Sequence, residues 1–147
     1  QGDEPLMNIE DIKNLNEYMS KSDLKMGTLA CKIIENKIYQ NENIVKVITK
    51  ESLENSKFPE AKNFKRNILG KNDNTYQHLG IYCYQLETLK KFVSLKQSPN
   101  EIKNKLEQLR ALDNNIKINV ALAKSNSIGV DTEEDFVAIK KIMEYKL

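Results

Sequence analysis

Residues 98–122 read SPNEIKNKLEQLRALDNNIKINVAL, and this stretch predicts a helix followed by a strand. Ser98 is a suitable N-cap, Pro99 suits the first helical position, and Glu101 completes a capping box. We expect the helix to run to about residue 112 with three apolar side chains on its buried face: Ile102, Leu106 and Leu109. A strict alternation of apolar residues then predicts a half-buried strand, through Ile116, Ile118, Val120 and Leu122.

Helices and strands also alternate along the rest of the chain. Periodic apolar residues predict an amphipathic helix over about 8–20 and a second helix carrying Leu86, Leu89, Phe92 and Val93. A last helix is expected to begin at Thr132 and to face inward through Phe136, Ile139 and Ile142 or Met143. Strands are predicted at 26–34, 44–49 and 76–84. The polar residues 50–74 are expected to form a long excursion with a single helical turn. This alternation indicates an α/β layered domain.

The composition is that of a single soluble domain. The chain has 147 residues, a net charge of +2, and 23 basic against 21 acidic side chains, which argues against a nucleic-acid binder. No apolar run approaches the roughly 20 residues of a membrane span, and no signal peptide is visible, so we expect no membrane partner and a cytoplasmic location. Cys31 and Cys83 lack CxxC spacing and His78 is the only histidine, which favours buried thiols over a zinc site.

Two aspartates far apart in the sequence each lie close to a glycine at the boundary of an element. Asp3 belongs to the run QGDEP at residues 1–5, ahead of the first helix, and Asp131 comes after a strand and before the N-cap Thr132. Ligands of open α/β folds bind at such positions, and one or two carboxylates commonly hold Mg²⁺. Both aspartates are therefore candidate Mg²⁺ ligands. The alternative is that Asp131 is only a polar residue in front of a capped helix.

A second candidate site lies on the predicted strand 76–84. One face of this strand would carry His78, Gly80, Tyr82 and Tyr84. Gly80 indicates a bulge or the close approach of a ligand. The alternative to a ligand site is that these side chains cover a sheet edge or a subunit interface.

A third group of polar residues lies within the helix predicted after Ser98. Glu107, Gln108 and Arg110 point away from the buried Leu109. On spacing alone, a solvated helix face is the simpler interpretation.

Four segments, in this order, resemble one enzyme family. They are residues 1–5 (QGDEP), 78–82 (HLGIY), 107–110 (EQLR) and 129–135 (GVDTEED), with Ser98 and Pro99 leading into the third. The order is typical of the 3-deoxy-manno-octulosonate cytidylyltransferases, or CMP-Kdo synthetases. The resemblance implies a nucleotide-diphospho-sugar transferase-like layered α/β fold, a mixed sheet flanked by helices, and a homodimer.

The resemblance also implies an activity. These enzymes couple CTP to the acid sugar 3-deoxy-manno-octulosonate (Kdo), releasing pyrophosphate and making CMP-Kdo for lipopolysaccharide. By motif matching, Asp3 and Asp131 would be the catalytic residues and would hold Mg²⁺. The sugar pocket would be lined by Gln1, His78, Tyr82, Glu107 and Gln108. Arg66 is the candidate for binding the sugar carboxylate, because a guanidinium offers a bidentate fork.

The chain departs from the family pattern in three ways. The usual aromatic-Phe-Ser-Arg run followed by Ile-Pro is replaced by AKNFKR at residues 61–66, and Cys83 stands where Gly is more common. The Pro-Ala-Arg and Leu-Pro-x-Lys segments that bind CTP are absent, so we expect residues 1–147 to be the C-terminal part of a single cytidylyltransferase domain, with its sugar-binding and dimerisation region, inactive alone. Two alternatives are a non-catalytic dimerisation or ligand-binding module, and a CMP synthetase for another acid sugar such as sialic acid.

Overall fold

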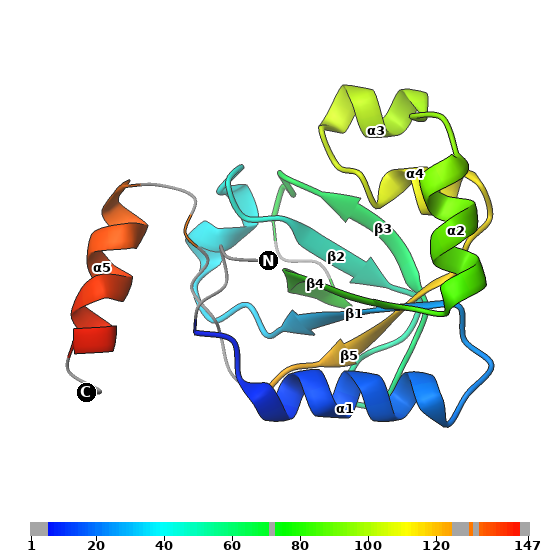
Figure 1. Ribbon diagram of the computed structural model, residues 1–147. Helices are drawn as coiled ribbons and strands as arrows, with labels where there is room; N and C mark the ends of the chain where they lie inside the picture. The colour runs from blue at the N-terminus through cyan, green and yellow to red at the C-terminus, as the bar shows by residue number, and fades with distance from the viewer. Residues whose placement is uncertain (1–5, 71–72, 125–129, 131–132, 145–147) are drawn as a thin grey trace.

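The computed structural model describes residues 6–70, 73–124, 130 and 133–144, and a mixed sheet lies at its centre (Figure 1). Within these residues the sheet has five strands in the order β3-β2-β4-β1-β5. Their bounds are β1 Met26–Cys31, β2 Lys46–Thr49, β3 Ala61–Lys65, β4 Thr75–Tyr84 and β5 Ile118–Leu122. β1 and β5 pair in parallel, and the other neighbours pair antiparallel. The predicted α/β layered fold with a mixed sheet is confirmed.

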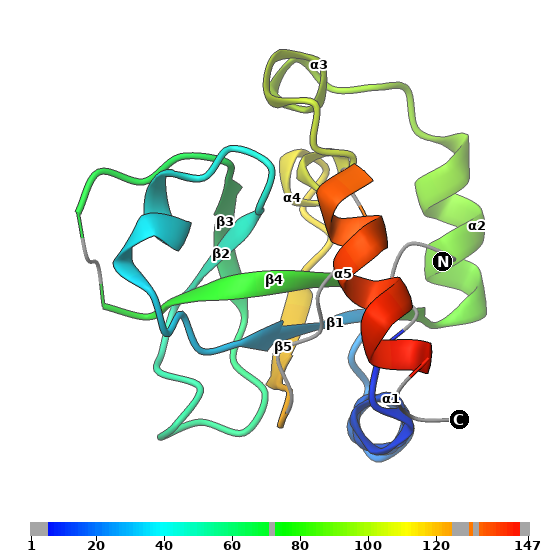
Figure 2. The ribbon, with the colours of Figure 1, turned by 90° about the vertical axis from the view of Figure 1, so that its left-hand side faces the viewer.

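Helices cover both faces of this sheet. They are α1 Ile9–Ser20, α2 Leu86–Ser94, α3 Pro99–Asn104, α4 Leu109–Asp113 and α5 Glu133–Glu144, together with the 3-10 helix η1 Asn36–Gln40. Figure 2 shows α1 on one side of the sheet and α2 to α4 on the other. No helix in the described part of the chain has the length and apolar content that crossing a membrane requires.

Helix α1 packs closely on β1. Asn8 caps the helix by accepting a hydrogen bond from the Glu10 backbone N–H at 2.9 Å. Leu15 and Met19 are buried against β1 and β4. A Cβ at Gly27 would lie 2.9 Å from the Met19 sulfur, so the glycine permits this approach of helix and strand.

The strand β3 corrects the prediction of a long excursion with a single helical turn over residues 50–74. Only Ala61 and Phe64 of this strand are buried, and its other residues are polar. Such a short edge strand has almost no periodic signal of its own. It forms because β2 offers a pairing edge, with Val47 opposite Phe64. The strand predicted to reach residue 34 is also shorter, since β1 ends at Cys31.

The helix predicted from Pro99 to about residue 112 is two helices. Ser98 and Glu101 form the predicted capping box. The helix α3 nevertheless ends at Asn104, because Lys105 adopts a left-handed conformation with φ 53° and ψ 46°. The helix α4 then begins at Leu109. This break redirects the chain between the two helices toward the sheet.

Several apolar side chains that were predicted to be buried are exposed. Ile102 is 61% exposed on α3, and Phe136 and Met143 are 50% and 47% exposed on α5. The break at Lys105 explains the exposure of Ile102, because α3 and α4 do not form one continuous helix with a single buried face. On α5, Ile139 is buried as predicted.

A bulge in β4 shapes the centre of the sheet. Thr28 of β1 lies opposite Tyr82, whereas the next residue, Leu29, lies opposite Leu79. Gly80 and Ile81 are therefore left outside the paired ladder. The bulge predicted from Gly80 is confirmed, and it lies beside the cavity described next.

Candidate functional site

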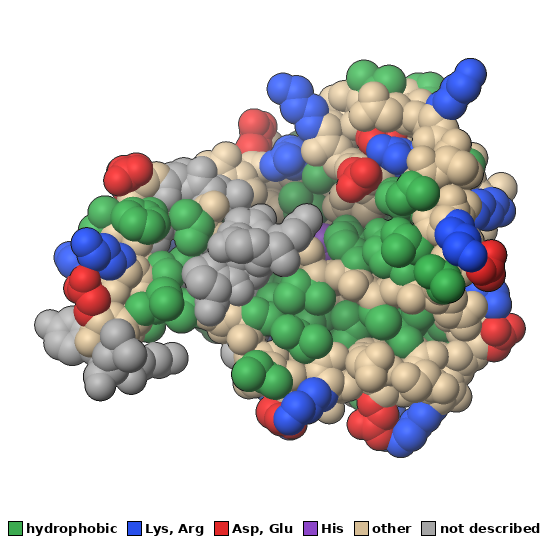
Figure 3. All heavy atoms as spheres, viewed as in Figure 1, with side chains coloured by type: hydrophobic (Ala, Val, Ile, Leu, Met, Phe, Trp, Pro, Cys, Tyr) green, Lys and Arg blue, Asp and Glu red, His purple; other side chains and the backbone are tan. Residues whose placement is uncertain are grey.

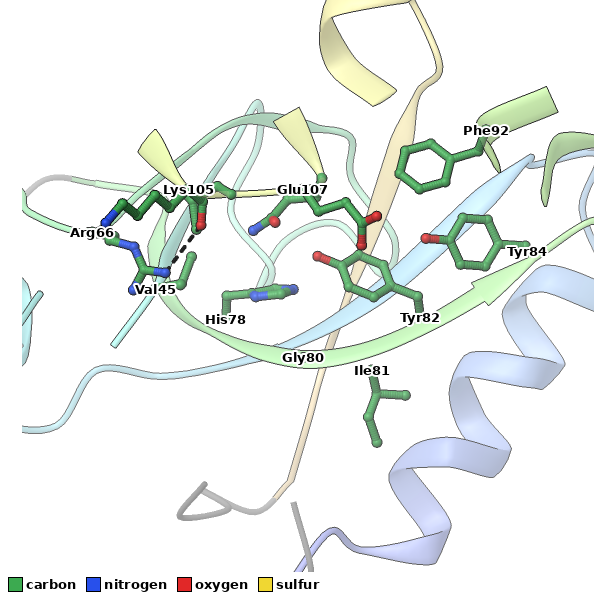
Figure 4. A pocket seen from close by; sticks show the side chains of 12 residues that line it. Val45, Arg66, His78, Gly80, Ile81, Tyr82, Tyr84, Phe92, Lys105 and Glu107 are labelled. Atoms are coloured by element: carbon green, nitrogen blue, oxygen red, sulfur yellow. Dashed lines mark hydrogen bonds between the residues drawn. The ribbon is translucent and has the colours of Figure 1, made fainter. Parts of the chain in front are cut away.

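A cavity of about 560 Å³ lies between strand β4 and the turn that joins α3 to α4 (Figure 4). It is lined by Val45, Arg66, His78, Gly80, Ile81, Tyr82, Tyr84, Phe92, Lys105, Leu106, Glu107 and Gln108. Its size falls within the range of small-molecule sites, about 300–1,000 Å³.

Aromatic rings form one wall of the cavity. His78, Tyr82 and Tyr84 share a face of β4 as predicted, with ring centroids 5.4 Å apart for the first pair and 6.0 Å for the second. Phe64 extends this row beyond His78 at 5.1 Å, and Phe92 extends it beyond Tyr84 at 5.9 Å. The rings are tilted relative to one another, and the row offers a largely apolar surface on which the carbon skeleton of a ligand could pack.

The imidazole of His78 is uncharged. Burial lowers the pKa of His78 to about 3, so the ring stays neutral at physiological pH. The Nε2 atom of His78 lies 2.9 Å from the Thr28 hydroxyl. His78 therefore serves the cavity as a fixed hydrogen-bonding group and not as a cation.

The hydroxyl of Tyr82 is buried and has no hydrogen-bond partner among the described residues. Burial raises the pKa of Tyr82 well above its usual value, with further contributions from Tyr84 and Glu107. Burying a hydroxyl without a partner costs about 1–3 kcal/mol. Because Tyr82 lines the cavity, a ligand hydroxyl or carboxylate would supply the missing partner.

The turn between α3 and α4 forms the opposite wall. Gln108 is buried there, whereas the Glu107 side chain is 70% exposed and accepts a hydrogen bond from Arg110 Nη2 at 3.2 Å. Figure 4 shows the Glu107 carboxylate above the Tyr82 ring, with the Tyr84 hydroxyl pointing toward it. The wall thus offers both an amide and a carboxylate to a polar ligand.

A buried ion pair fixes this turn. Arg110 donates to both carboxylate oxygens of Glu101, at 2.8 and 2.5 Å, and its guanidinium lies 5.0 Å from the centre of the Phe92 ring. The hydrogen bonds from Arg110 are the main cause that lowers the pKa of Glu101 to about 2. Since Glu101 also closes the capping box of α3, the pair ties α3 to α4.

Two cations occupy one corner of the cavity. Arg66 donates to the backbone carbonyls of Glu42 at 3.0 Å, Lys105 at 3.2 Å and Asn104 at 3.4 Å. These bonds use three of the five guanidinium N–H groups, which leaves two for a ligand. The side chain of Lys105 reaches the same corner (Figure 4).

A buried lysine supports this corner from below. The Lys46 ammonium donates to the carbonyls of Asn41 at 2.8 Å, of Ile44 at 2.7 Å and of Arg66. Burial, together with the nearby Arg66 charge, lowers the pKa of Lys46 to about 8. Three carbonyls use all three ammonium donors, so Lys46 holds the Arg66 backbone in place and does not face a ligand.

The structure brings five of the predicted site residues together. Arg66, His78, Tyr82, Glu107 and Gln108 all line the one cavity, although they come from three separate parts of the sequence. Their role as sugar ligands stays a prediction. Gln1, Asp3 and Asp131 lie outside the described residues, and no cluster of three His, Cys, Asp or Glu side chains that could hold a metal occurs in the described part of the chain.

Some residues of the site were not predicted. Lys105 and Val45 line the cavity, and Phe92 was expected only as part of a helical stripe. The left-handed backbone conformation of Lys105 directs its side chain to the cavity. A lysine in the sequence does not predict this conformation. Val45 owes its place to the pairing of β2 with β4.

The amino-acid sequence matches a known protein family. A family model described as cytidylyltransferase matches residues 1–118. The chain belongs to the cytidylyltransferase family. The five cavity residues named above lie within the part that matches the family, whereas Asp131 lies beyond it.

Curated relatives and a solved structure agree with the family. The 3-deoxy-manno-octulosonate cytidylyltransferases of Thermodesulfovibrio yellowstonii and Bartonella henselae are 41% and 39% identical, and each alignment covers 97% of this chain but 58% of the relative. This cytidylyltransferase chain therefore spans less than two thirds of the length of those relatives. A structure of CMP:2-keto-3-deoxy-manno-octonic acid synthetase complexed with CTP superimposes with a TM-score of 0.84 at 27% identity, covering 100% of this chain and 61% of that one.

Proposed function

We propose that the cavity binds Kdo and that the protein carrying it is a 3-deoxy-manno-octulosonate cytidylyltransferase. In this reaction the anomeric hydroxyl oxygen of Kdo forms a bond to the α-phosphorus of CTP and loses its proton. The bond from that phosphorus to the bridging oxygen breaks, and pyrophosphate leaves. The observation that carries the proposal is a single cavity with an aromatic wall, a polar wall and a cationic corner.

Each part of the cavity suits one part of an acid sugar. The ring row of His78, Tyr82 and Tyr84 would pack against the carbon skeleton, and the sugar would give the Tyr82 hydroxyl the partner that the described residues do not supply. Glu107 and Gln108 would hydrogen-bond to sugar hydroxyls from the opposite wall. These contacts orient the sugar and limit its motion, which is how binding groups lower the barrier of a displacement.

The cationic corner distinguishes an acid sugar from a neutral one. Arg66 retains two N–H groups beyond its three backbone bonds, and the Lys105 ammonium lies beside it. A carboxylate placed there would receive charge-assisted hydrogen bonds, which are shorter and stronger than neutral ones. We therefore assign the Kdo carboxylate to this corner.

The metal site is part of the proposal. We propose that Asp3 and Asp131 hold Mg²⁺, because hard carboxylate oxygens with substrate phosphates are the ligand set this ion prefers. When bound, Mg²⁺ neutralises charge on the phosphates of CTP.

We also propose that the protein acts in the cytoplasm as a homodimer, as the resemblance to the family implies. The exposed apolar residues Leu86 and Val93 on α2 are compatible with an interface. Light scattering coupled to size-exclusion chromatography of this chain tests the dimer, and a mass of one chain at micromolar concentration would contradict it.

Isothermal titration calorimetry of this chain tests the sugar cavity directly. We expect Kdo to bind at least about tenfold more tightly than N-acetylneuraminate. Arg66→Ala should remove most of the affinity for Kdo, whereas Lys103→Ala, a control on the exposed surface of α3, should leave it unchanged. Equal affinity for both sugars, or no effect of Arg66→Ala on Kdo binding, would show that the cavity is not the Kdo site.

A further inference from the structure

The contact between Thr28 and His78 indicates which nitrogen of the His78 ring carries the proton. Thr28 lies on β1, is completely buried, and faces the bulge of β4. Its hydroxyl oxygen lies 2.7 Å from the Ile81 carbonyl oxygen and 3.4 Å from that of Leu79. The same oxygen lies 2.9 Å from His78 Nε2. One hydroxyl therefore meets two carbonyls and one ring nitrogen.

Counting protons settles the direction of these bonds. A carbonyl oxygen only accepts, so the short contact with Ile81 requires Thr28 to donate its single proton there. The Thr28 oxygen must then accept from His78, which means that Nε2 carries a proton. The opposite arrangement would leave the Ile81 carbonyl, freed from the ladder by the bulge, without this donor.

A neutral imidazole has one N–H, so the other ring nitrogen is an acceptor. Burial keeps His78 neutral by lowering its pKa to about 3. Nδ1 has no hydrogen-bond partner among the described residues, and the ring lines the cavity. The cavity thus receives a lone pair from His78 and no proton.

We propose that Thr28 is a positioning residue that locks His78 in its Nε2–H tautomer, so that Nδ1 accepts a hydrogen bond from a hydroxyl group of the ligand. The identity of that ligand as an acid sugar rests on the proposed function. The tautomer itself does not, because it follows from contacts between β1 and β4 alone. A neutral acceptor at this place favours a ligand hydroxyl over a carboxylate or a phosphate oxygen, which have no proton to donate.

The single histidine of the chain makes the tautomer measurable without assignment. Long-range ¹H–¹⁵N correlation spectra of this chain at pH 7 should show one protonated nitrogen at Nε2 and one bare nitrogen at Nδ1. Thr28→Val, which keeps the shape but removes the hydroxyl, should shift the ring toward a mixture of both tautomers. Thr28→Ser should restore the pattern of the unmodified chain. A Nδ1–H tautomer in the unmodified chain, or an unchanged tautomer in Thr28→Val, would overturn the proposal.

A kinetic readout separates positioning from a purely structural role. In the protein at the full length of its relatives, Thr28→Val should raise the KM for Kdo about tenfold, the effect of one neutral hydrogen bond, with the KM for CTP unchanged. Equal rises in both constants would indicate a structural defect and overturn the positioning role. If the spectra agree with the proposal but the chain does not bind Kdo, the proposed function fails and the tautomer assignment stands.

Discussion

At the scale of single residues, the cavity combines neutral hydrogen-bonding groups with cations at one corner. His78 and Tyr82 are both held in their neutral forms by burial. Arg66 and Lys105 supply the positive charge. This separation means that charge recognition and hydroxyl recognition depend on different side chains, so that each can be tested by its own substitution.

The Tyr82 hydroxyl gives a prediction in which stability and binding change in opposite directions. The buried Tyr82 hydroxyl has no hydrogen-bond partner within the described parts of the chain, and removing it relieves its desolvation cost. Tyr82→Phe should therefore leave the free energy of unfolding of the free chain unchanged or raise it by about 1 kcal/mol. The affinity for Kdo should fall, because the hydroxyl is expected to bond to the sugar. Urea unfolding and calorimetry measure the two effects. A clear loss of stability in Tyr82→Phe would mean that the hydroxyl already has a partner.

Some features of this site can be predicted from the sequence, and others cannot. Period-two alternation along 76–84 was enough to place His78 and Tyr82 on one face, because strand geometry alone decides it. The contact of His78 with Thr28 depends on the register between β1 and β4, which a bulge shifts. The cationic corner depends on a left-handed backbone at Lys105. Gly80 indicates the bulge but not the strand that pairs with it, and the conformation at Lys105 has no local signal in the sequence.

At the scale of elements, the short helices α3 and α4 carry one wall of the cavity. Five or six residues each are too few for a stable isolated helix, so their position depends on side-chain ties. The ion pair of Glu101 and Arg110 is the main tie, and both side chains are nearly buried. The position of the cavity wall that contains Gln108 therefore depends on the Glu101 carboxylate, which lies on the preceding helix α3.

This ion pair predicts a dependence of stability on pH. The pKa of Glu101 is lowered to about 2 in the folded chain, against about 4.3 when unfolded. The stabilisation is therefore fully present above about pH 5 and is lost as the pH falls toward 2. Glu101→Gln should reduce the free energy of unfolding at pH 7 by about 2 kcal/mol and flatten this part of the pH profile. An equally steep acid loss in the variant, measured by denaturant titration, would contradict the assignment.

The packing of α1 on β1 gives a second prediction at this scale. Gly27→Ala would place a Cβ 2.9 Å from both the Met19 sulfur and the Phe58 ring, so helix or strand must shift. We expect the free energy of unfolding to fall by about 1–3 kcal/mol. Lys62→Ala, on the exposed side of β3, is the control and should change it by less than about 0.5 kcal/mol. Equal stability of Gly27→Ala and the unmodified chain would show that this close approach does not exist.

Elements with a strong local signal were predictable, and those that depend on neighbours were not. The capping box at Ser98 and the alternation that became β5 both follow from local residues. The edge strand β3 exists only because β2 pairs with it, and its polar sequence alone does not predict a strand. The single helix predicted beyond residue 99 failed because helix propensity does not reveal a left-handed residue at Lys105.

At the scale of the whole molecule, exposed apolar side chains lie on the surface around the sheet. Figure 3 shows green surface across the face that α1 and α2 border. Leu86, Val93 and Ile9 are each more than half exposed. A surface of this kind marks a site of interaction, in keeping with the proposed dimer.

The two aspartates that we propose as Mg²⁺ ligands come from opposite ends of the sequence. We expect Asp3→Asn and Asp131→Asn each to abolish turnover while leaving the unfolding transition intact. Asparagine keeps the size of the aspartate side chain but lacks the negative charge that a Mg²⁺ ligand supplies, which is the reason for that separation. Near-normal activity in either variant, measured with saturating CTP and Kdo, would refute its role as a metal ligand.

An assay of pyrophosphate release tests most simply whether the protein is a cytidylyltransferase that acts on Kdo. The assay uses the protein at the full length of its relatives, with CTP and Mg²⁺, and compares Kdo with N-acetylneuraminate. We expect release with Kdo alone, and loss of that release in Arg66→Ala when Kdo is limiting. Release with N-acetylneuraminate in place of Kdo, or no release with either sugar from a folded protein that binds CTP, would contradict it.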